Sequence, residues 1–234
     1  MKNYALITGS SKGIGKELSL LFLQKGYTVF GYSRTNSIKH NNFHFNQVDL
    51  SNVKNLESIN FPKVDENEHV CLINNAGEIG EINKFGNKKT NDIINDFNLN
   101  TITPCILCNT FIRSYQNQSN HPIIINISSG AALRPIESWG TYCQSKAALD
   151  MLTKIINQEQ NSIKAYSIYP GVVDTEMQKK IRDTDIEKFA LKDIFVEYFR
   201  NNELVDPKII SKKIYHIISN LDLFEDNMVS LRDL

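Results

Sequence analysis

Short apolar runs rich in β-branched and aromatic residues alternate along the chain with longer segments that have helical spacing. The runs cover residues 4–8, 27–33, 43–48, 69–74, 122–128, 163–169 and, more weakly, 227–231. In the segments between them, apolar residues recur at i, i+3 and i+4, as at Leu18, Leu21 and Phe22. Strands that alternate with helices form a parallel sheet covered on both faces.

This pattern predicts an α/β fold, a Rossmann-type doubly wound parallel sheet of about seven strands with helices on both faces. We find no internal repeat or dividing linker, so residues 1–234 are expected to form one domain. Ser51 and the pair Asp206-Pro207 are expected to begin helices, and Gly26 to close the first one.

Residues 176–204 follow Pro170-Gly171 and are helical in period but rich in Lys, Asp and Glu. We predict that they form a mobile excursion over the site. The alternative is an ordinary exposed pair of helices.

Charge and composition narrow the function classes. Lys plus Arg and Asp plus Glu number 26 each, which leaves no net field for nucleic acid or an anionic membrane. The first apolar run begins close to Met1 and no run reaches about 18 residues, so we expect neither a signal peptide nor a membrane span. Four dispersed cysteines fit a reducing cytoplasm, and they and the five histidines lack metal-ligand spacing, so no metal is expected.

A glycine-rich turn follows the first strand and opens the first helix. Within Thr8-Gly9-Ser10-Ser11-Lys12-Gly13-Ile14-Gly15, Gly9 permits the sharp turn, Gly13 a close approach to a pyrophosphate and Gly15 close packing of helix on sheet. The helix N-terminus would attract that anion. Such turns also occur without a ligand, and the strand-turn-helix context favours dinucleotide binding.

The end of the second strand bears on the choice of dinucleotide. It reads Tyr32-Ser33-Arg34 and carries no carboxylate for ribose hydroxyls. Arg34 offers a planar fork for a 2′-phosphate, and Lys12 adds a second cation. These residues predict NADP(H), unless both are simply solvated surface cations.

Tyr142 and Lys146 stand four residues apart at the start of a predicted helix, on one face. A phenol titrates near about 10, and a neighbouring ammonium favours its ionised form. The pair therefore suits general acid catalysis, although its spacing alone is common.

Several motifs accompany that pair in a fixed order. They are the glycine turn at 8–15, Asn74-Asn75-Ala76-Gly77 after the fourth strand, Ser128-Ser129 after the fifth, Tyr142 with Lys146, and Pro170-Gly171 after the sixth. With them the chain, over residues 4 to about 175, resembles the short-chain dehydrogenase/reductase family.

The resemblance implies reduction of a carbonyl by hydride transfer from the nicotinamide of the cofactor. Tyr142 would donate a proton to the substrate oxygen, Ser129 would hydrogen-bond that oxygen, and Lys146 would hold the nicotinamide ribose and lower the pKa of Tyr142. Asn100 resembles the helix asparagine that supports a water relay to the lysine, with Asn98 as the competing candidate.

The resemblance also implies cofactor contacts. Asp49 would meet the adenine amino group, Asn75 would lie beside the adenosine ribose, and Pro170, Gly171 and Thr175 would contact the nicotinamide carboxamide. Ala76, Gly77 and Val173 are expected to add further cofactor contacts. Each has a plainer interpretation: Asp49 could cap a helix, the Asn75 motif could be a turn, and the serines could end a strand.

Other residues with reactive side chains are expected to have structural roles. Cys105 and Cys108 lie within a predicted helix and favour core packing over redox chemistry. His40 and His44 flank a polar loop. Cys143 adjoins Tyr142 and could make activity sensitive to alkylation.

The substrate class rests on a weaker resemblance. Residues 202–207, a terminal helix and an Arg-Asp ending resemble the sepiapterin reductase and benzil reductase branch, which reduces vicinal dicarbonyls. The pocket would be lined by Gly130, Ala131, Trp139 and the excursion. The alternatives are a 3-ketoacyl carrier-protein reductase, another short-chain alcohol dehydrogenase or a non-enzymatic NADP-binding regulator.

The family resemblance also implies a homodimer or homotetramer built through two long helices at 91–115 and 142–161.

Overall fold

The computed structural model describes residues 2–234. Seven parallel strands form one sheet in the order β3-β2-β1-β4-β5-β6-β7. They are β1 (Asn3–Thr8), β2 (Thr28–Ser33), β3 (Phe43–Gln47), β4 (His69–Asn74), β5 (Ile123–Ile127), β6 (Lys164–Tyr169) and β7 (Met228–Ser230). The predicted doubly wound sheet is confirmed, and each strand agrees with its predicted run to within one residue at either end.

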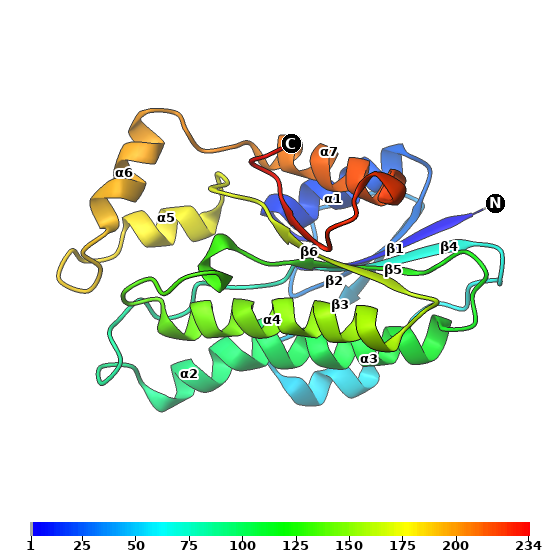
Figure 1. Cartoon of the computed structure of the whole chain (residues 1–234), viewed down its shortest axis with the longest axis horizontal. Helices are drawn as coiled ribbons and strands as arrows, with labels where there is room; N and C mark the ends of the chain where they lie inside the picture. Colours follow the sequence, from blue (N-terminus) through cyan, green and yellow to red (C-terminus); the bar gives the residue numbers. More distant parts are fainter. Residues whose placement is uncertain (1) are drawn as a thin grey trace.

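Helices cover both faces of the sheet (Figure 1). On one face, α1 (Gly13–Gln24) and α7 (Pro207–Ser219) contribute Leu18, Phe22 and Ile214 to one core. On the other face, α3 (Thr103–Tyr115) and α4 (Gly140–Glu159) contribute Phe111 and Ile156 to a second core. Buried apolar area on both faces explains why the strands carry nearly continuous apolar runs.

The connection into α3 is irregular. Helix α2 (Thr90–Phe97) continues through a π-helical segment, Asn98–Ile102, directly into α3. The long helix expected at 91–115 is therefore interrupted by a wider turn, a feature that often occurs at functional sites. Three short 3₁₀ helices complete this layer and the connections: Val53–Ser58, Gly130–Ala132 and Leu221–Leu223.

The strand order reverses between β1 and β4, and ligands of such sheets bind where the adjoining carboxyl ends part. Helices α5 (Glu176–Arg182) and α6 (Lys192–Arg200) form the predicted excursion and lie beyond that end of the sheet (Figure 1). A parallel bridge between Val173 and Val205 closes its base, with Val205 N donating to Val172 O at 2.9 Å. The excursion is thus anchored at both ends.

Local helix signals were mostly correct. Asp206 caps α7 by accepting from Lys208 N, and Gly26 closes α1 at a φ of +82°. The prediction that Ser51 begins a helix was wrong by one residue: Asn52 caps the 3₁₀ helix there by accepting from Lys54 N. The N–H and the hydroxyl of Ser51 instead donate to the carboxylate of Asp49 in the turn before this helix.

Within residues 2–234, no helix combines the length and apolar character that crossing a bilayer requires.

Candidate active site

The glycine turn between β1 and α1 is built for close approach. Gly9 and Gly13 have φ values of +67° and +54°, which favour glycine. A Cβ at Gly15 would lie 2.3 Å from the carbonyl oxygen of Gly9, so only glycine lets the helix start against the turn. Lys12 caps α1 without a side-chain hydrogen bond. The positive end of α1 therefore faces an open backbone cradle.

The Asn75 motif after β4 holds this turn in place. The Asn75 amide donates to the carbonyl oxygens of Thr8 at 2.9 Å and Gly9 at 3.3 Å. In return, the Thr8 hydroxyl accepts from the backbone N–H groups of Asn75 and Ala76. Sequence reasoning assigned Asn75 to the cofactor ribose; its observed contacts join the two strand ends that flank the switch point.

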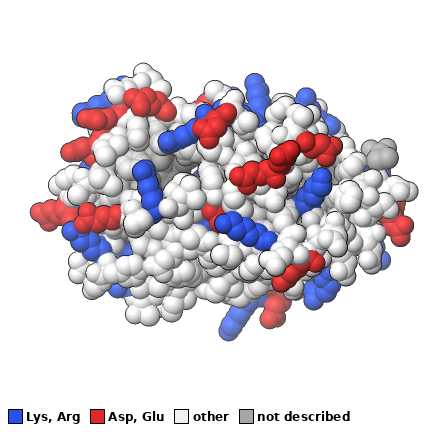
Figure 2. Space-filling view, in the orientation of Figure 1, with Lys and Arg blue, Asp and Glu red and all other residues white. Residues whose placement is uncertain are grey.

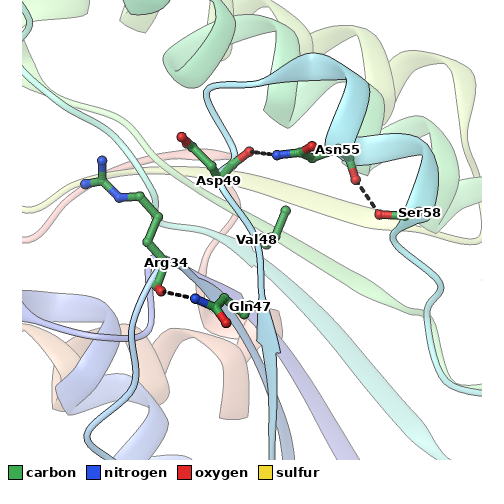
Figure 3. Close-up of a pocket in the computed structure, with 6 residues that line it drawn as sticks. All are labelled: Arg34, Gln47, Val48, Asp49, Asn55 and Ser58. Carbon is green, nitrogen blue, oxygen red and sulfur yellow. Dashed lines mark hydrogen bonds between the residues drawn. The ribbon is translucent and has the colours of Figure 1, made fainter.

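Arg34 and Asp49 lie together at the ends of β2 and β3. They line a pocket of about 320 Å³, together with Gln47, Val48, Asn55 and Ser58 (Figure 3). Bonds to Ser51 are the main cause that lowers the pKa of Asp49, with a smaller effect from the charge of Arg34. Asp49 therefore does not cap the 3₁₀ helix, which Asn52 caps; its carboxylate accepts from Ser51 in the turn before that helix.

Arg34 also has a partner that the sequence did not suggest. Its guanidinium Nη2 lies 3.6 Å from Glu78 Oε1, and both side chains are more than half exposed. Glu78 directly follows the Asn75-Ala76-Gly77 motif. Because the pair is exposed, it contributes little to stability and is free to exchange for another anion.

The predicted catalytic side chains converge at the carboxyl ends of β4 and β5 and the start of α4. Lys146 Nζ donates to Ile127 O at 2.8 Å and lies 5.6 Å from the centroid of the Tyr142 ring. Tyr142 shares a side-chain hydrogen bond with Ser129. Ser129 also accepts from Ala131 N, which fixes its hydroxyl at the start of the 3₁₀ helix.

Burial controls the ionisation of both groups. It raises the pKa of Tyr142 to about 12, against the lowering effect of the bond to Ser129. It lowers the pKa of Lys146 to about 8, partly offset by the charge of Asp150. The net effect on the pKa of Tyr142 is thus opposite to the lowering expected from Lys146, and Tyr142 holds its proton at neutral pH.

Asn100 joins this group and Asn98 has no comparable place. Asn100 is 1% exposed, and a Cβ at Gly77 would lie 3.1 Å from its Oδ1 and 3.4 Å from Lys146 Nζ. Its side chain also bonds the backbone of Glu78 on both sides. The π-helical turn places Asn100 toward Lys146, as the spacing to Pro104 had favoured.

The segment after β6 borders the glycine turn. Thr175 Cγ2 would lie 3.3 Å from a Cβ at Gly13, so the two segments face each other across the cradle. Gly171 has a φ of +80° and packs against the side chain of Arg232. Pro170 is half-buried and Val173 is buried in the bridge that closes the excursion.

Trp139 lies against Tyr142, as expected of a pocket wall, but it is only 6% exposed. Its ring stacks on Phe189 at 5.4 Å between centroids, and Phe195 lies at 5.3 Å. No sequence motif marks these two phenylalanines; the available signal is that they are aromatic residues in an otherwise charged segment. Ala131 belongs to the same cluster, whereas Gly130 is exposed beside it.

The two cysteines of α3 have surroundings that fit a structural role. Cys108 is buried in α3 and receives a hydrogen bond from Asn74, consistent with core packing; Cys105 is half-buried. Within residues 2–234 no group of His, Cys, Asp or Glu is arranged to hold a metal ion.

A nucleotide cradle at the switch point, with Ser, Tyr and Lys beside it, defines a dinucleotide-dependent oxidoreductase. The model of the short chain dehydrogenase family matches residues 3–186. The chain belongs to this family of oxidoreductases, whose members bind a nicotinamide cofactor.

Individual relatives refine the comparison. The chain is 30% identical to a benzil reductase ((S)-benzoin forming) of Bacillus cereus, over 97% of this chain and 98% of the relative. It is 33% identical to the sepiapterin reductase of Bos taurus, over 70% of this chain and 62% of the relative. A short-chain dehydrogenase/reductase structure from Saccharomyces cerevisiae superposes with a TM-score of 0.81 at 23% identity, covering 98% of this chain and 96% of that one. The structural likeness supports the fold alone, and the sequence relatives support carbonyl reduction as the general reaction.

Proposed function

We propose that the protein uses NADPH to reduce one carbonyl of a vicinal dicarbonyl, of the benzil or sepiapterin kind, to a hydroxyl. The observation that carries the proposal is the group formed by Ser129, Tyr142 and Lys146 at the carboxyl edge of the sheet, with Tyr142 buried and protonated. The similarity to benzil reductases over nearly the whole chain supports the substrate class.

The proton chemistry follows from the side chains. NADPH, when bound, supplies a hydride to the carbonyl carbon. Tyr142 transfers its phenolic proton to the carbonyl oxygen, and Ser129 donates a hydrogen bond to that oxygen as negative charge develops on it. Lys146 binds the nicotinamide ribose hydroxyls and, as an ammonium, stabilises the phenolate left on Tyr142.

The cradle fits a dinucleotide because its glycines keep the turn tight and its backbone bare: a Cβ at Gly9 or Gly15 would overlap Asn75 or the turn itself. The backbone there would hold the pyrophosphate, and Arg34 with Lys12 would hold the 2′-phosphate that distinguishes NADPH. The other contacts are proposed for Ser11, Gly13, Ile14, Asp49, Asn75, Ala76, Gly77, Pro170, Gly171, Val173 and Thr175. Thr8, Asn75 and Glu78 would keep these segments in register.

The decisive test is a panel of carbonyls assayed for NADPH oxidation with chiral analysis of the products. We expect turnover of aromatic α-diketones or a pteridine diketone. The Tyr142→Phe variant should lose on the order of a hundredfold or more in kcat while still binding NADPH. NADPH binding without turnover of any carbonyl would favour a regulatory protein, and equal or better efficiency with NADH would contradict the cofactor assignment.

We further propose that copies of this chain assemble through α3 and α4 into a dimer or tetramer. Met151 and Ile155 on α4 are 55% and 41% exposed, one helical turn apart, and Ile102 precedes α3 at 38%. Uncharged atoms predominate over this part of the surface (Figure 2). Replacing Met151 and Ile155 by glutamate should shift the mass measured by light scattering to that of a monomer.

The four unpaired cysteines support a cytoplasmic location.

A further inference from the structure

The start of α4, which carries Tyr142, lacks the capping interactions that usually stabilise the first turn of a helix. Trp139 stands at its N-cap without a side-chain capping bond, and no acidic residue lies in its first turn. Ser138 before it has a φ of +67°, an uncommon value for a residue with a side chain. The first turn of a helix has unpaired N–H groups and frays unless other groups satisfy them.

A carboxylate from another helix meets this turn. Asp96, in the last turn of α2, is 7% exposed and accepts a hydrogen bond from the Thr141 hydroxyl at 2.6 Å. Thr141 directly precedes Tyr142. Asp96 therefore places negative charge beside the positive end of α4, where such charge is stabilising.

The surroundings of Asp96 are shaped to admit that carboxylate. A Cβ at Gly80 would lie 2.2 Å from both carboxylate oxygens of Asp96. Gly80 also has a φ of +72°, so both steric overlap and backbone conformation disfavour a side chain there. Burial raises the pKa of Asp96, and the Thr141 bond and the charges of Lys88 and Lys180 oppose that effect. A buried carboxylate is costly without such partners.

The loop between β4 and α2, which contains Gly80, also contacts the residues at the start of α4. Asn83 N donates to Ser138 O at 3.1 Å, and the Phe85 ring covers Gly140 so closely that a Cβ there would lie 2.2 Å from it. An ion pair between Lys84 and Glu137, at 2.7 Å, joins the same two segments, but its side chains are about half exposed, whereas the bond between Thr141 and Asp96 is buried. The loop after β4 and the end of α2 together supply the packing contacts and the negative charge that the first turn of α4 does not provide for itself.

We propose that Asp96 is a positioning residue for Tyr142: through Thr141 it fixes the first turn of α4 so that the phenol is held beside Ser129. The proposal rests on the function proposed above, because it assigns Tyr142 the proton transfer. Asp96 itself touches neither Tyr142 nor a substrate atom in this scheme. A misplacement of about 1 Å at such a group costs on the order of a hundredfold in rate.

The test compares Thr141→Val, Thr141→Ser, Asp96→Leu and the double variant Asp96→Leu/Thr141→Val. We expect Thr141→Val to lower kcat on the order of ten- to a hundredfold with the KM for NADPH within about twofold, and Thr141→Ser to recover most of the loss. The double variant should be no slower than the worse single variant, because both changes break one bond. Asp92→Asn, in the first turn of α2, is the control and should behave as wild type.

Additive losses, failure of serine to restore kcat, or an unchanged kcat in Thr141→Val would each overturn the proposal. Hydrogen exchange of residues 140–146 provides a readout without turnover. The first turn of α4 should exchange at least about tenfold faster in Thr141→Val than in wild type or Thr141→Ser. If wild type reduced none of the carbonyls, the proposed function would fail while this measurement still decided whether Asp96 holds the helix; unchanged exchange would reject it.

Discussion

The side chain of Asn100 forms hydrogen bonds with both the N–H and the C=O group of Glu78. Its Oδ1 accepts from Glu78 N at 3.0 Å, and its Nδ2 donates to Glu78 O at 2.8 Å. The carboxylate of Glu78 pairs with Arg34 at the other end of the cradle. One residue of the loop after β4 therefore links the catalytic end of the site to its proposed phosphate end.

Replacement of Asn100 by alanine should release this loop. Two hydrogen bonds to a half-buried backbone are lost, so we expect the free energy of unfolding in urea to fall by about 1–3 kcal/mol. Reduction should also slow. Asn98→Ala is the matched control two residues away, and a larger effect there than at Asn100 would reverse the assignment.

The pH dependence of reduction should reflect Lys146. Burial lowers its pKa to about 8, so the ammonium is present below that pH and lost above it. If the ammonium is the active form, kcat/KM for NADPH should be level below about pH 8 and fall tenfold per pH unit above it. Lys146→Arg should remove that fall because arginine keeps its charge. A level profile through pH 9 in the wild type would contradict this role.

Gly15→Ala should distort the glycine turn that forms the cradle. Its Cβ would meet Gly9 O at 2.3 Å and Asn75 Nδ2 at 2.4 Å, so the turn has to move. We expect NADPH affinity, measured by fluorescence titration, to fall by about tenfold or more. Gly26→Ala is the control for a general loss of stability: Gly26 has a positive φ, so alanine is strained there, but open space surrounds it and no cofactor contact is proposed for it. That variant should lower stability and leave NADPH affinity unchanged.

Glu78 competes with a phosphate for Arg34. Glu78→Gln removes the ion pair, and because the pair is exposed we expect NADPH affinity to rise only roughly two- to fivefold. Arg34→Ala should erase the preference for NADPH over NADH and leave NADH affinity near its wild-type value. Isothermal titration of all three proteins with both cofactors checks this, and a wild-type preference that survives in Arg34→Ala would refute it.

Trp139 should influence which dicarbonyl is reduced. Its ring joins Tyr142 to Phe189 and Phe195 of the excursion, so its removal opens space beside the phenol. Trp139→Ala should lower kcat/KM for aromatic diketones more than for small aliphatic ketones. Trp139→Phe keeps an aromatic ring and guards against a folding defect. An unchanged preference in both variants would remove Trp139 from the substrate pocket.

The sequence alone determined the succession of strands and helices along the chain and the chemical groups of the site. Alternation of apolar runs with helical spacing is a local property, and the glycine turn, Tyr142 and Lys146 are local motifs, so all were predictable. The spacing of Asn100 from Pro104 selected it over Asn98 for the same reason.

Only the tertiary structure decided how those groups are held and charged. The pKa of Tyr142 depends on burial, and Asp96 meets Thr141 across 45 residues of chain. Phe189 stacks on Trp139, and Glu78 reaches Arg34, through contacts between segments distant in sequence. No periodicity or motif records such contacts, because desolvation and packing arise only when separate elements come together in space.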